Sequence, residues 1–302
     1  MTEMPVRAGV RRVGEVDLMV DDRGSEDWPA IVIAVGFGEQ LGSVEFPDDF
    51  ADALCVRNRR VVRFDHRDVG LSSGFDDQPV DHVDVRSRVR GQAVDLPYTL
   101  VDMADDLAGI IRSLGDRPVR LVGVSMGGII ARWTAVRYPD LVDSLVLVMT
   151  PFDLRPTEGL PAPDPTVVEK MVAKAERRDR AEAIAAAVEA WRSYAGTEFP
   201  FDEDWTRRRV TFAHDRSYRP EALARQLAAM AASPPIAPHH GTITAPTLIV
   251  QGDADPIIAP AHGIALAAAI PRASLEMIRG MGHELPPAAW PQLLDAVAGS
   301  NP

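Results

Sequence analysis

The sequence predicts an α/β protein built on a mostly parallel, twisted sheet with helices on both faces. Three observations support this fold class. Short apolar runs rich in β-branched residues alternate with amphipathic stretches along most of the chain. The alternation stops between residues 150 and 246, where helical patterns continue without a convincing strand pattern. Several predicted helices begin at or near a proline, which suits the first helical turn because an N–H there has no helical partner.

The predicted elements follow one another in a regular order. Residues 14–20 alternate polar and apolar side chains and are expected to form an antiparallel edge strand. Six apolar runs predict buried strands, at residues 31–35, 60–64, 119–124, 144–149, 247–251 and 275–278. Amphipathic stretches between them predict helices at residues 47–57, 99–114, 126–138, 260–269 and 286–298.

Residues 151–240 are predicted to form an all-helical lid inserted into a core made of residues 1–150 and 241–302. Helical patterns cover residues 165–194, 202–213 and 220–232, and proline-rich borders mark the change of unit. We expect this lid at the carboxyl ends of the strands, where ligands bind in open α/β folds. Its aromatic residues form either the core of the lid or a pocket wall, and Trp191 and Trp205 are the candidates for substrate binding.

Composition restricts the classes of partner. Of 302 residues, 46% are hydrophobic and 25% charged, the ordinary balance of a globular protein. The formal charge of −12 repels phosphate backbones and anionic membranes. No stretch approaches the length of a membrane span, and the single cysteine, Cys55, excludes an intrachain disulfide and is expected on the buried face of a helix. We therefore expect a cytoplasmic protein without nucleic-acid or membrane partners, its oligomeric state undetermined by the sequence.

A candidate nucleophile lies between a predicted strand and a predicted helix. The pattern G-x-S-x-G occupies residues 123–127, with Ser125 at its centre. A sharp strand-to-helix turn holds such a serine above the sheet, and glycines flank it because neighbouring backbone leaves no room for side chains. The start of the following helix directs N–H groups to the same point, so the Met126 N–H is a candidate oxyanion donor.

The base that would activate this serine is predicted to be His283. It lies in RGMGHELP, directly after the last predicted strand, and so at the carboxyl edge of the sheet. His239 and His240 lie in a polar, proline-rich segment and are expected in a solvated loop. The other histidines lack the spacing of metal ligands, so no metal site is predicted.

An acid that orients the histidine is expected after the strand at residues 247–251, where Asp253 and Asp255 are the candidates. Local chemistry separates the two only weakly. The residue before Pro256 is held in extended conformation, which suits a carboxylate aimed at a neighbouring loop and favours Asp255. Asp253 would then cap the turn.

The loop after the second predicted strand, AVGFGEQLG, supplies a second candidate oxyanion donor. Glycines let its backbone approach a ligand, so we expect the Phe37 N–H to donate, with Gly36 beside the substrate. A competing interpretation is a dinucleotide fingerprint that binds nicotinamide cofactors, although its third glycine is displaced to Gly42 and Asp65 would have to serve as the acidic partner. The segment FDHRDVGLSSG is expected to form an ion-paired loop that braces the site.

Together these segments resemble the α/β-hydrolase fold family over nearly the whole chain, and within it the esterase group that includes aclacinomycin methylesterase. The resemblance rests on RFDHRDVGLSS, PYTLVDMADDL, VGVSMGG, APTLIVQGDADPIIAP and GMGHELP. It implies an eight-stranded sheet, with Ser125 as nucleophile, His283 as base and Asp255 as acid. It also implies that the backbone of Phe37 and Met126 forms the oxyanion hole.

The resemblance and the residues imply a serine hydrolase that cleaves a small to medium, apolar carboxylic ester through an acyl-enzyme, without a metal or organic cofactor. Many relatives carry His-Gly where this chain has Val35 and Gly36, which leaves the ester unspecified. Dehalogenases and epoxide hydrolases of this fold need a carboxylate nucleophile at the strand-to-helix turn. Because this chain has Ser125 there, these two activities are disfavoured. Lactonase, thioesterase, carbon–carbon hydrolase, perhydrolase and a non-catalytic small-molecule-binding protein stay open as alternatives.

Overall fold

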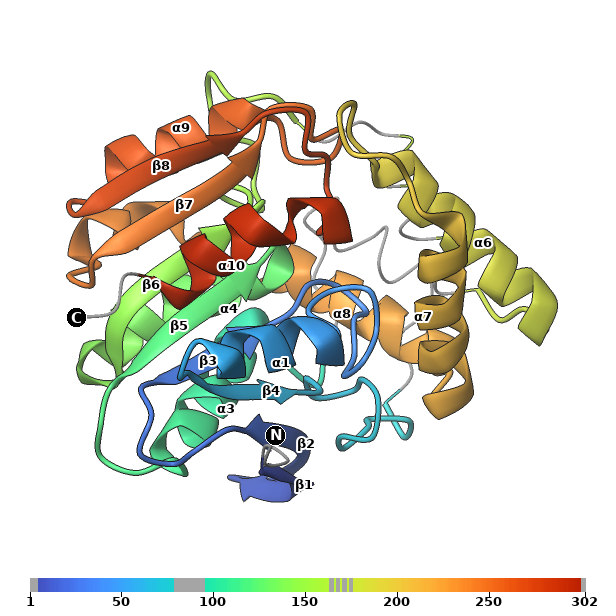
Figure 1. The fold of residues 1–302 in the computed structure, drawn as a ribbon, viewed down its shortest axis with the longest axis horizontal. Coiled ribbons are helices and arrows are strands. Elements are labelled where there is room, and N and C mark those ends of the chain that lie inside the picture. Colours follow the sequence, from blue (N-terminus) through green and yellow to red (C-terminus); the bar gives the residue numbers. More distant parts are fainter. Residues whose placement is uncertain are drawn as a thin grey trace.

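A single eight-stranded sheet forms the centre of the computed structural model, which describes residues 5–78, 96–162, 166, 169, 173 and 176–299 (Figure 1). The strand order is β1-β2-β4-β3-β5-β6-β7-β8. The pairs β1–β2 and β2–β4 are antiparallel, and all other pairs are parallel. The strands are β1 (Val6–Val13), β2 (Val16–Arg23), β3 (Ala30–Ala34), β4 (Arg60–Phe64), β5 (Val119–Val124), β6 (Val142–Val148), β7 (Thr247–Gly252) and β8 (Ala273–Ile278). The predicted fold class is confirmed.

The central strands are apolar on both faces because helices cover both. In β3, Val32 and Ala34 join one hydrophobic core, while Ile31 and Ile33 join another on the opposite face. This two-residue period is the geometry of a strand, and its burial on both sides explains the continuous apolar runs in the sequence.

Helices α1 (Asp48–Val56) and α10 (Trp290–Ala298) pack on one face of the sheet, and α3 (Leu100–Arg112), α4 (Met126–Arg137) and α9 (Pro260–Ala269) pack on the other (Figure 1). Helix α3 begins with a capping box in which Thr99 and Asp102 satisfy each other's backbone N–H groups. Short 3₁₀ helices occupy η1 (Pro139–Leu141), η2 (Ala237–Thr242) and η3 (Pro287–Ala289). Among the described residues, no helix combines the length and the apolar composition needed to cross a membrane.

The edge of the sheet differs from the prediction. Instead of one strand at residues 14–20, the chain forms a hairpin of β1 and β2, and Gly14 turns it with φ 54. Strand β1 lies at the edge and most of its residues are exposed. It therefore lacks the buried face that would give it a recognisable hydrophobic pattern.

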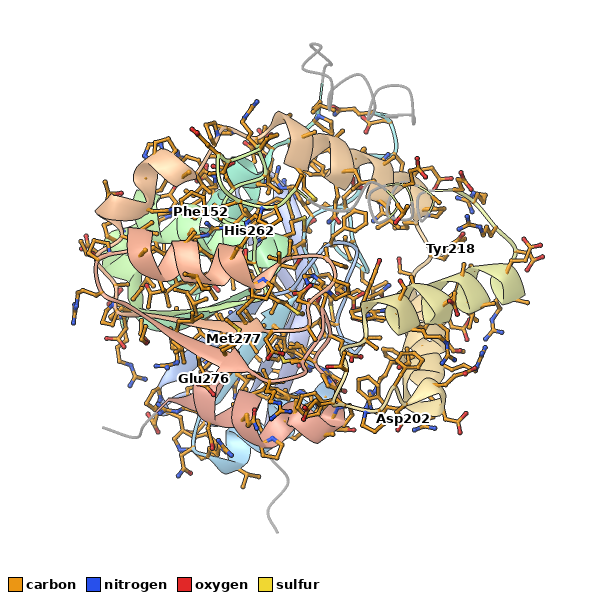
Figure 2. The ribbon with its side chains drawn as sticks, turned by 90° about the horizontal axis from the view of Figure 1, so that it is seen from above. Phe152, Asp202, Tyr218, His262, Glu276 and Met277 are labelled. Carbon is orange, nitrogen blue, oxygen red and sulfur yellow. The ribbon has the colours of Figure 1, made fainter. Side chains whose placement is uncertain are left out.

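Helices α6 (Arg180–Tyr194), α7 (Glu203–Arg216) and α8 (Pro220–Ala232) lie between β6 and β7, and the described residues there contain no strand. Most of residues 165–175, the first part of the predicted helical stretch 165–194, lies outside the described residues. Asp202 precedes α7 and Tyr218 lies two residues beyond its end. Both are on the opposite side of the molecule from Glu276 and Met277 on the edge strand β8 (Figure 2).

His240 is not in a solvated loop, so that prediction was wrong. It lies in η2, is buried, and its Nε2 atom is 2.7 Å from Nη1 of Arg132 on α4. Burial lowers the pKa of His240 to about 3, so the neutral ring accepts a hydrogen bond from the arginine. The guanidinium of Arg132 is buried and therefore requires hydrogen-bond acceptors. The polar segment that contains His240 supplies one of them in the interior.

Candidate active site

Ser125 occupies a sharp turn between β5 and α4. Its backbone has φ 49 and ψ −116, a strained conformation for a residue with a side chain. Its N–H donates to the carbonyl of Val148 at the end of β6, over 3.0 Å. A Cβ atom at Gly127 would lie 2.1 Å from the carbonyl oxygen of Ala34, and one at Gly123 would lie 2.6 Å from that of Gly127. Glycine is therefore required on both sides of the serine.

The structure brings Ser125, His283 and Asp255 into one hydrogen-bonded series. His283 Nε2 lies 3.1 Å from Ser125 Oγ, and His283 Nδ1 lies 2.8 Å from Asp255 Oδ2. His283 and Asp255 are buried, whereas Ser125 is partly exposed. Because a carboxylate can only accept, Nδ1 carries the ring proton, and Nε2 is left to accept from the serine hydroxyl.

The two candidate acids after β7 have different partners. The second oxygen of Asp255 accepts the N–H groups of Ile257 and Ile258, each over 2.8 Å, which fixes the carboxylate opposite His283. Asp253 instead accepts the N–H of Gly280 over 2.6 Å, in the turn that follows β8. Asp255 faces the histidine ring, and Asp253 joins two loops.

The candidate oxyanion donors lie at the ends of β3 and β5. Met126 is the first residue of α4, so its N–H has no acceptor within the helix. In the loop after β3, the Gly36 N–H donates to Glu45 Oε2 over 2.7 Å, and the Gly38 N–H donates to Gln226 Oε1 over 3.0 Å. Between them, the Phe37 N–H has no acceptor among the described residues.

Three buried side chains that hold this loop were not identified from the sequence: Glu45, Gln226 and His66. Nε2 of His66 donates to the Val35 carbonyl over 3.1 Å, and burial lowers the pKa of His66 to about 4, so that the ring stays neutral. His66 belongs to the segment that was expected to brace the site. Nothing in the local sequence marks Gln226, because its partner Gly38 is 188 residues away, and no motif pairs Glu45 with Gly36, nine residues before it.

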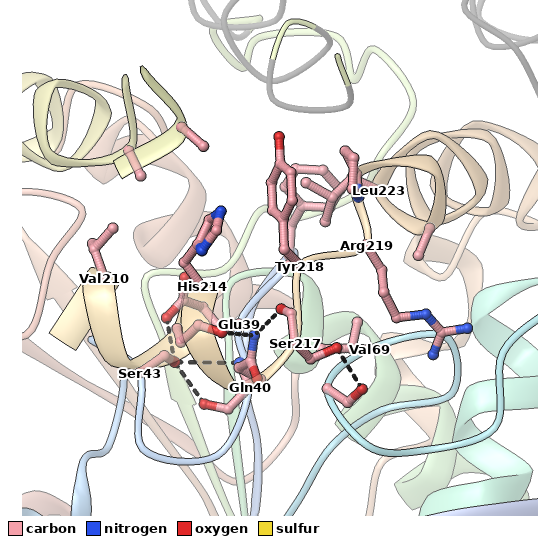
Figure 3. Close-up of a pocket in the computed structure, with 18 of the residues that line it drawn as sticks. Glu39, Gln40, Ser43, Val69, Val210, His214, Ser217, Tyr218, Arg219 and Leu223 are labelled. Carbon is pink, nitrogen blue, oxygen red and sulfur yellow. Dashed lines mark hydrogen bonds between the residues drawn. The ribbon is translucent and has the colours of Figure 1, made fainter. Parts of the chain in front are cut away.

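A cavity of about 160 Å³ lies between the loops after β3 and β4 and the helices α6, α7 and α8 (Figure 3). Tyr218 and Leu223 line it on the helical side, and Gln40, Ser43 and Val69 line the opposite side. Phe37 also lines it, whereas Ser125 and His283 do not. The cavity therefore begins beside the candidate oxyanion loop rather than directly over the serine.

The three candidate substrate-binding residues are placed differently. Trp191 lines the cavity. Trp205 instead lines a separate small crevice, and its ring centroid is 6.3 Å from that of Trp290. Gly36 directs its N–H to Glu45, and a Cβ atom there would lie 2.7 Å from the Glu45 carboxylate. Only Trp191 of the three therefore borders the cavity.

Two buried aspartates from FDHRDVGLSSG bind the helices between β6 and β7 to the sheet. Asp68 accepts two hydrogen bonds from Arg225 on α8, over 2.6 and 2.8 Å. Asp65 accepts from Arg216 on α7 and from the N–H groups of Leu41 and Leu71. Both oxygens of Asp65 are thus occupied, which argues against its binding a nucleotide ribose and against the dinucleotide interpretation.

The end of α6 contacts the loop that carries the histidine. The His283 N–H donates to the Tyr194 carbonyl over 2.8 Å. The Gly196 N–H donates to Oε1 of Glu284 over 3.2 Å. Glu284 is buried, and burial raises its pKa to about 7, an increase that the Gly196 N–H partly opposes.

The chain is similar to a known protein family and to several known proteins. Residues 29–286 match the family described as alpha/beta hydrolase fold. Rhodomycin D methylesterase DauP of Streptomyces sp. (strain C5) is 29% identical over 90% of both chains, and DnrP of Streptomyces peucetius, of the same name, is 28% identical over 94% of both. A thermophilic esterase from Thermogutta terrifontis, solved with malate bound, superposes with a TM-score of 0.68 at 26% identity, over 98% of this chain and 97% of that one. The chain therefore belongs to the alpha/beta hydrolase fold family.

Proposed function

We propose that this protein is a serine esterase that hydrolyses a carboxylic ester through an acyl-enzyme. The observation that carries the proposal is the hydrogen-bonded series from Ser125 through His283 to Asp255. The similarity to two methylesterases supports ester hydrolysis as the reaction class. In this proposal Ser125 is the nucleophile, His283 the general base and Asp255 the residue that orients the base.

The reaction begins when His283 Nε2 takes the hydroxyl proton of Ser125 and the serine oxygen attacks the ester carbonyl. The N–H groups of Phe37 and Met126 stabilise the resulting oxyanion. The alcohol leaves with the proton from His283, and the acyl group stays on Ser125. Water then attacks the acyl-enzyme in the same way, while Asp255 stabilises the charged imidazolium in both halves of the reaction.

We propose that residues 151–240 form a lid and that the cavity beneath it holds one side group of the ester. Phe37, Trp191 and Leu223 give the cavity an apolar wall. A cavity of about 150 Å³ has room for a benzene molecule, so this one has room for a group about the size of a single ring. Neutral esters with a small to medium apolar group are the expected substrates.

A fluorophosphonate probe tests the nucleophile. Intact-mass spectrometry should find one adduct per chain on the wild type and none on Ser125→Ala. Ser125→Ala and His283→Ala should lower kcat for p-nitrophenyl butyrate by about 10⁶-fold, and Asp255→Asn by about 10⁴-fold. Asp253→Asn is the matched control, because it removes a neighbouring carboxylate that does not touch the histidine.

Absence of an adduct in wild-type protein that is shown to be folded would overturn the proposal and favour a binding protein with the same fold. Full activity of Asp255→Asn together with an inactive Asp253→Asn would reverse the assignment of the acid. Preference for charged short-chain esters over neutral butyrate or hexanoate esters would contradict the substrate class.

A further inference from the structure

The loop that carries the candidate oxyanion donor is held from two sides. Residues 35–38, here called the oxyanion loop, present three successive N–H groups. That of Gly36 is bound by Glu45, and that of Gly38 is bound by Gln226. Only the middle N–H, from Phe37, has no acceptor in the described part of the chain. Glu45 and Gln226 therefore accept the N–H groups on either side of Phe37, and the Phe37 N–H is left to donate to a ligand.

We propose that Gln226, on lid helix α8, is a positioning residue for the oxyanion hole: by binding the Gly38 N–H it holds the Phe37 N–H in the direction that the oxyanion needs. This inference rests on the proposed function, in which Phe37 donates to the oxyanion. Glu45 belongs to the same segment as the loop, but Gln226 lies 188 residues further along the chain. The lid thereby completes the oxyanion hole in addition to covering the substrate.

Close contact between α8 and the loop supports this role. Gly38 has φ 73, and a Cβ atom there would lie 2.8 Å from Cδ2 of Leu223, one helical turn before Gln226. The helix therefore touches the backbone of the loop directly. Gln226 is 0% exposed, so its side chain has little freedom to move away from Gly38.

The chemistry of the side chain points to the same role. Nε2 of Gln226 is buried without a hydrogen-bond partner among the described residues. A buried amide with an unused donor is less favourable than an apolar side chain of the same size, so packing alone does not account for glutamine at this position. The acceptor Oε1, which binds the loop, is the part of the amide that an apolar side chain cannot replace.

A neighbouring contact fixes α8 directly beside Gln226. Arg225, the preceding residue, is paired with the buried Asp68. Because the helix is anchored at this point, Gln226 is presented to the loop by a rigid support.

The test compares Gln226→Met with Ser233→Ala. Methionine keeps the length and apolar bulk of glutamine without its amide oxygen. Ser233→Ala is the matched control, because it removes a buried hydrogen bond between the same helix and the core, away from the oxyanion loop. Both variants are assayed for kcat and KM on p-nitrophenyl butyrate, for inhibition by a trifluoromethyl ketone, and for urea unfolding. The ketone forms a tetrahedral serine adduct whose oxyanion occupies the hole.

Gln226→Met should lower kcat by about 10- to 100-fold with KM changed less than about twofold, since misplacing a catalytic donor costs turnover rather than ground-state binding. Affinity for the trifluoromethyl ketone should fall by a similar factor. Ser233→Ala should lose stability but keep kcat. Unchanged kcat and ketone affinity in Gln226→Met, or a change in KM alone, would overturn the inference.

A second variant, Gln226→Glu, keeps the inference testable if Gln226→Met does not fold. Its protonated carboxyl keeps an oxygen acceptor for Gly38, and burial favours the protonated form. At pH 6 the ratio of its kcat to that of the wild type should be close to one, because the oxygen acceptor for the Gly38 N–H is retained. A folded Gln226→Glu protein whose kcat at pH 6 is lower by about 10-fold or more contradicts the inference. Ser125→Ala in the same assay separates the esterase proposal from the proposed role of Gln226. Retained turnover in Ser125→Ala would refute Ser125 as the nucleophile of the proposed esterase.

Discussion

The free energy of unfolding of the wild type should fall as the pH rises from about 4.5 to 7, because Glu284 is buried. The Glu284→Gln variant should not show this fall. Burial raises the pKa of Glu284 from its ordinary value of 4.5 to about 7 in the native state. Between these values the unfolded chain ionises this carboxyl while the native chain keeps the proton. The native state therefore binds more protons, and the free energy of unfolding falls as the pH rises.

The size of the effect follows from the pKa. At 1.36 kcal/mol per pH unit, a rise from 4.5 to about 7 corresponds to about 3 kcal/mol. This contribution is fully present below pH 4.5 and lost by about pH 7. Glutamine cannot ionise, and its side-chain oxygen still accepts the Gly196 N–H that now binds Glu284. The variant should therefore gain stability relative to the wild type by about 3 kcal/mol between pH 4.5 and pH 8.

Urea unfolding of both proteins at half-unit steps from pH 4.5 to pH 8 measures this difference directly. Glu189→Gln, at an exposed position on α6, controls for the loss of one carboxylate. A difference between Glu284→Gln and the wild type that stays constant across the range would refute the reasoning, because it would mean that Glu284 ionises alike in the folded and unfolded chain.

Three further predictions concern the packing of the fold. Gly127→Ala should destabilise the fold by at least about 2 kcal/mol, because the new Cβ atom would overlap a backbone oxygen of β3. Gly241→Ala, where no atom lies within 4 Å of the added Cβ, should change unfolding by no more than about 0.5 kcal/mol, and equal effects would contradict the packing argument. Arg225→Met should cost about 3 to 5 kcal/mol in urea unfolding because it leaves Asp68 buried without its main partner, and a neutral result would show that water or another group replaces it. Cys55 should resist dithiobisnitrobenzoate at pH 8 until the protein unfolds, since burial raises its pKa to about 11, and fast labelling of the native protein would contradict this.

Much of the fold and the central part of the candidate site could be predicted because their signals are local. A buried parallel strand needs a short apolar run, and six such runs correspond to β3 through β8. The turn at Ser125 needs glycines within two residues on either side, so a five-residue pattern identified it. Asp255 and His283 lie in the loops that follow β7 and β8, and parallel strands bring their carboxyl ends to one edge of the sheet.

Features that depend on partners distant in the chain could not be predicted in this way. Strand β1 is defined by its pairing with β2 and has no buried face of its own. His240 is buried because Arg132, more than a hundred residues earlier, needs an acceptor. Local chemistry alone separated Asp253 from Asp255 only weakly, whereas their hydrogen-bond partners on neighbouring loops differ plainly.

Local patterns predict most element types, the order of β2 to β8 along the chain and the position of the serine turn, since each depends on the dihedral angles and burial period of a few consecutive residues. Which side chains hold the oxyanion loop depends instead on tertiary packing. Gln226 meets Gly38 only because Arg225 and Asp68 bring α8 against the sheet. A hydrogen bond between residues so far apart has no local pattern, because its geometry is set by the packing of whole elements.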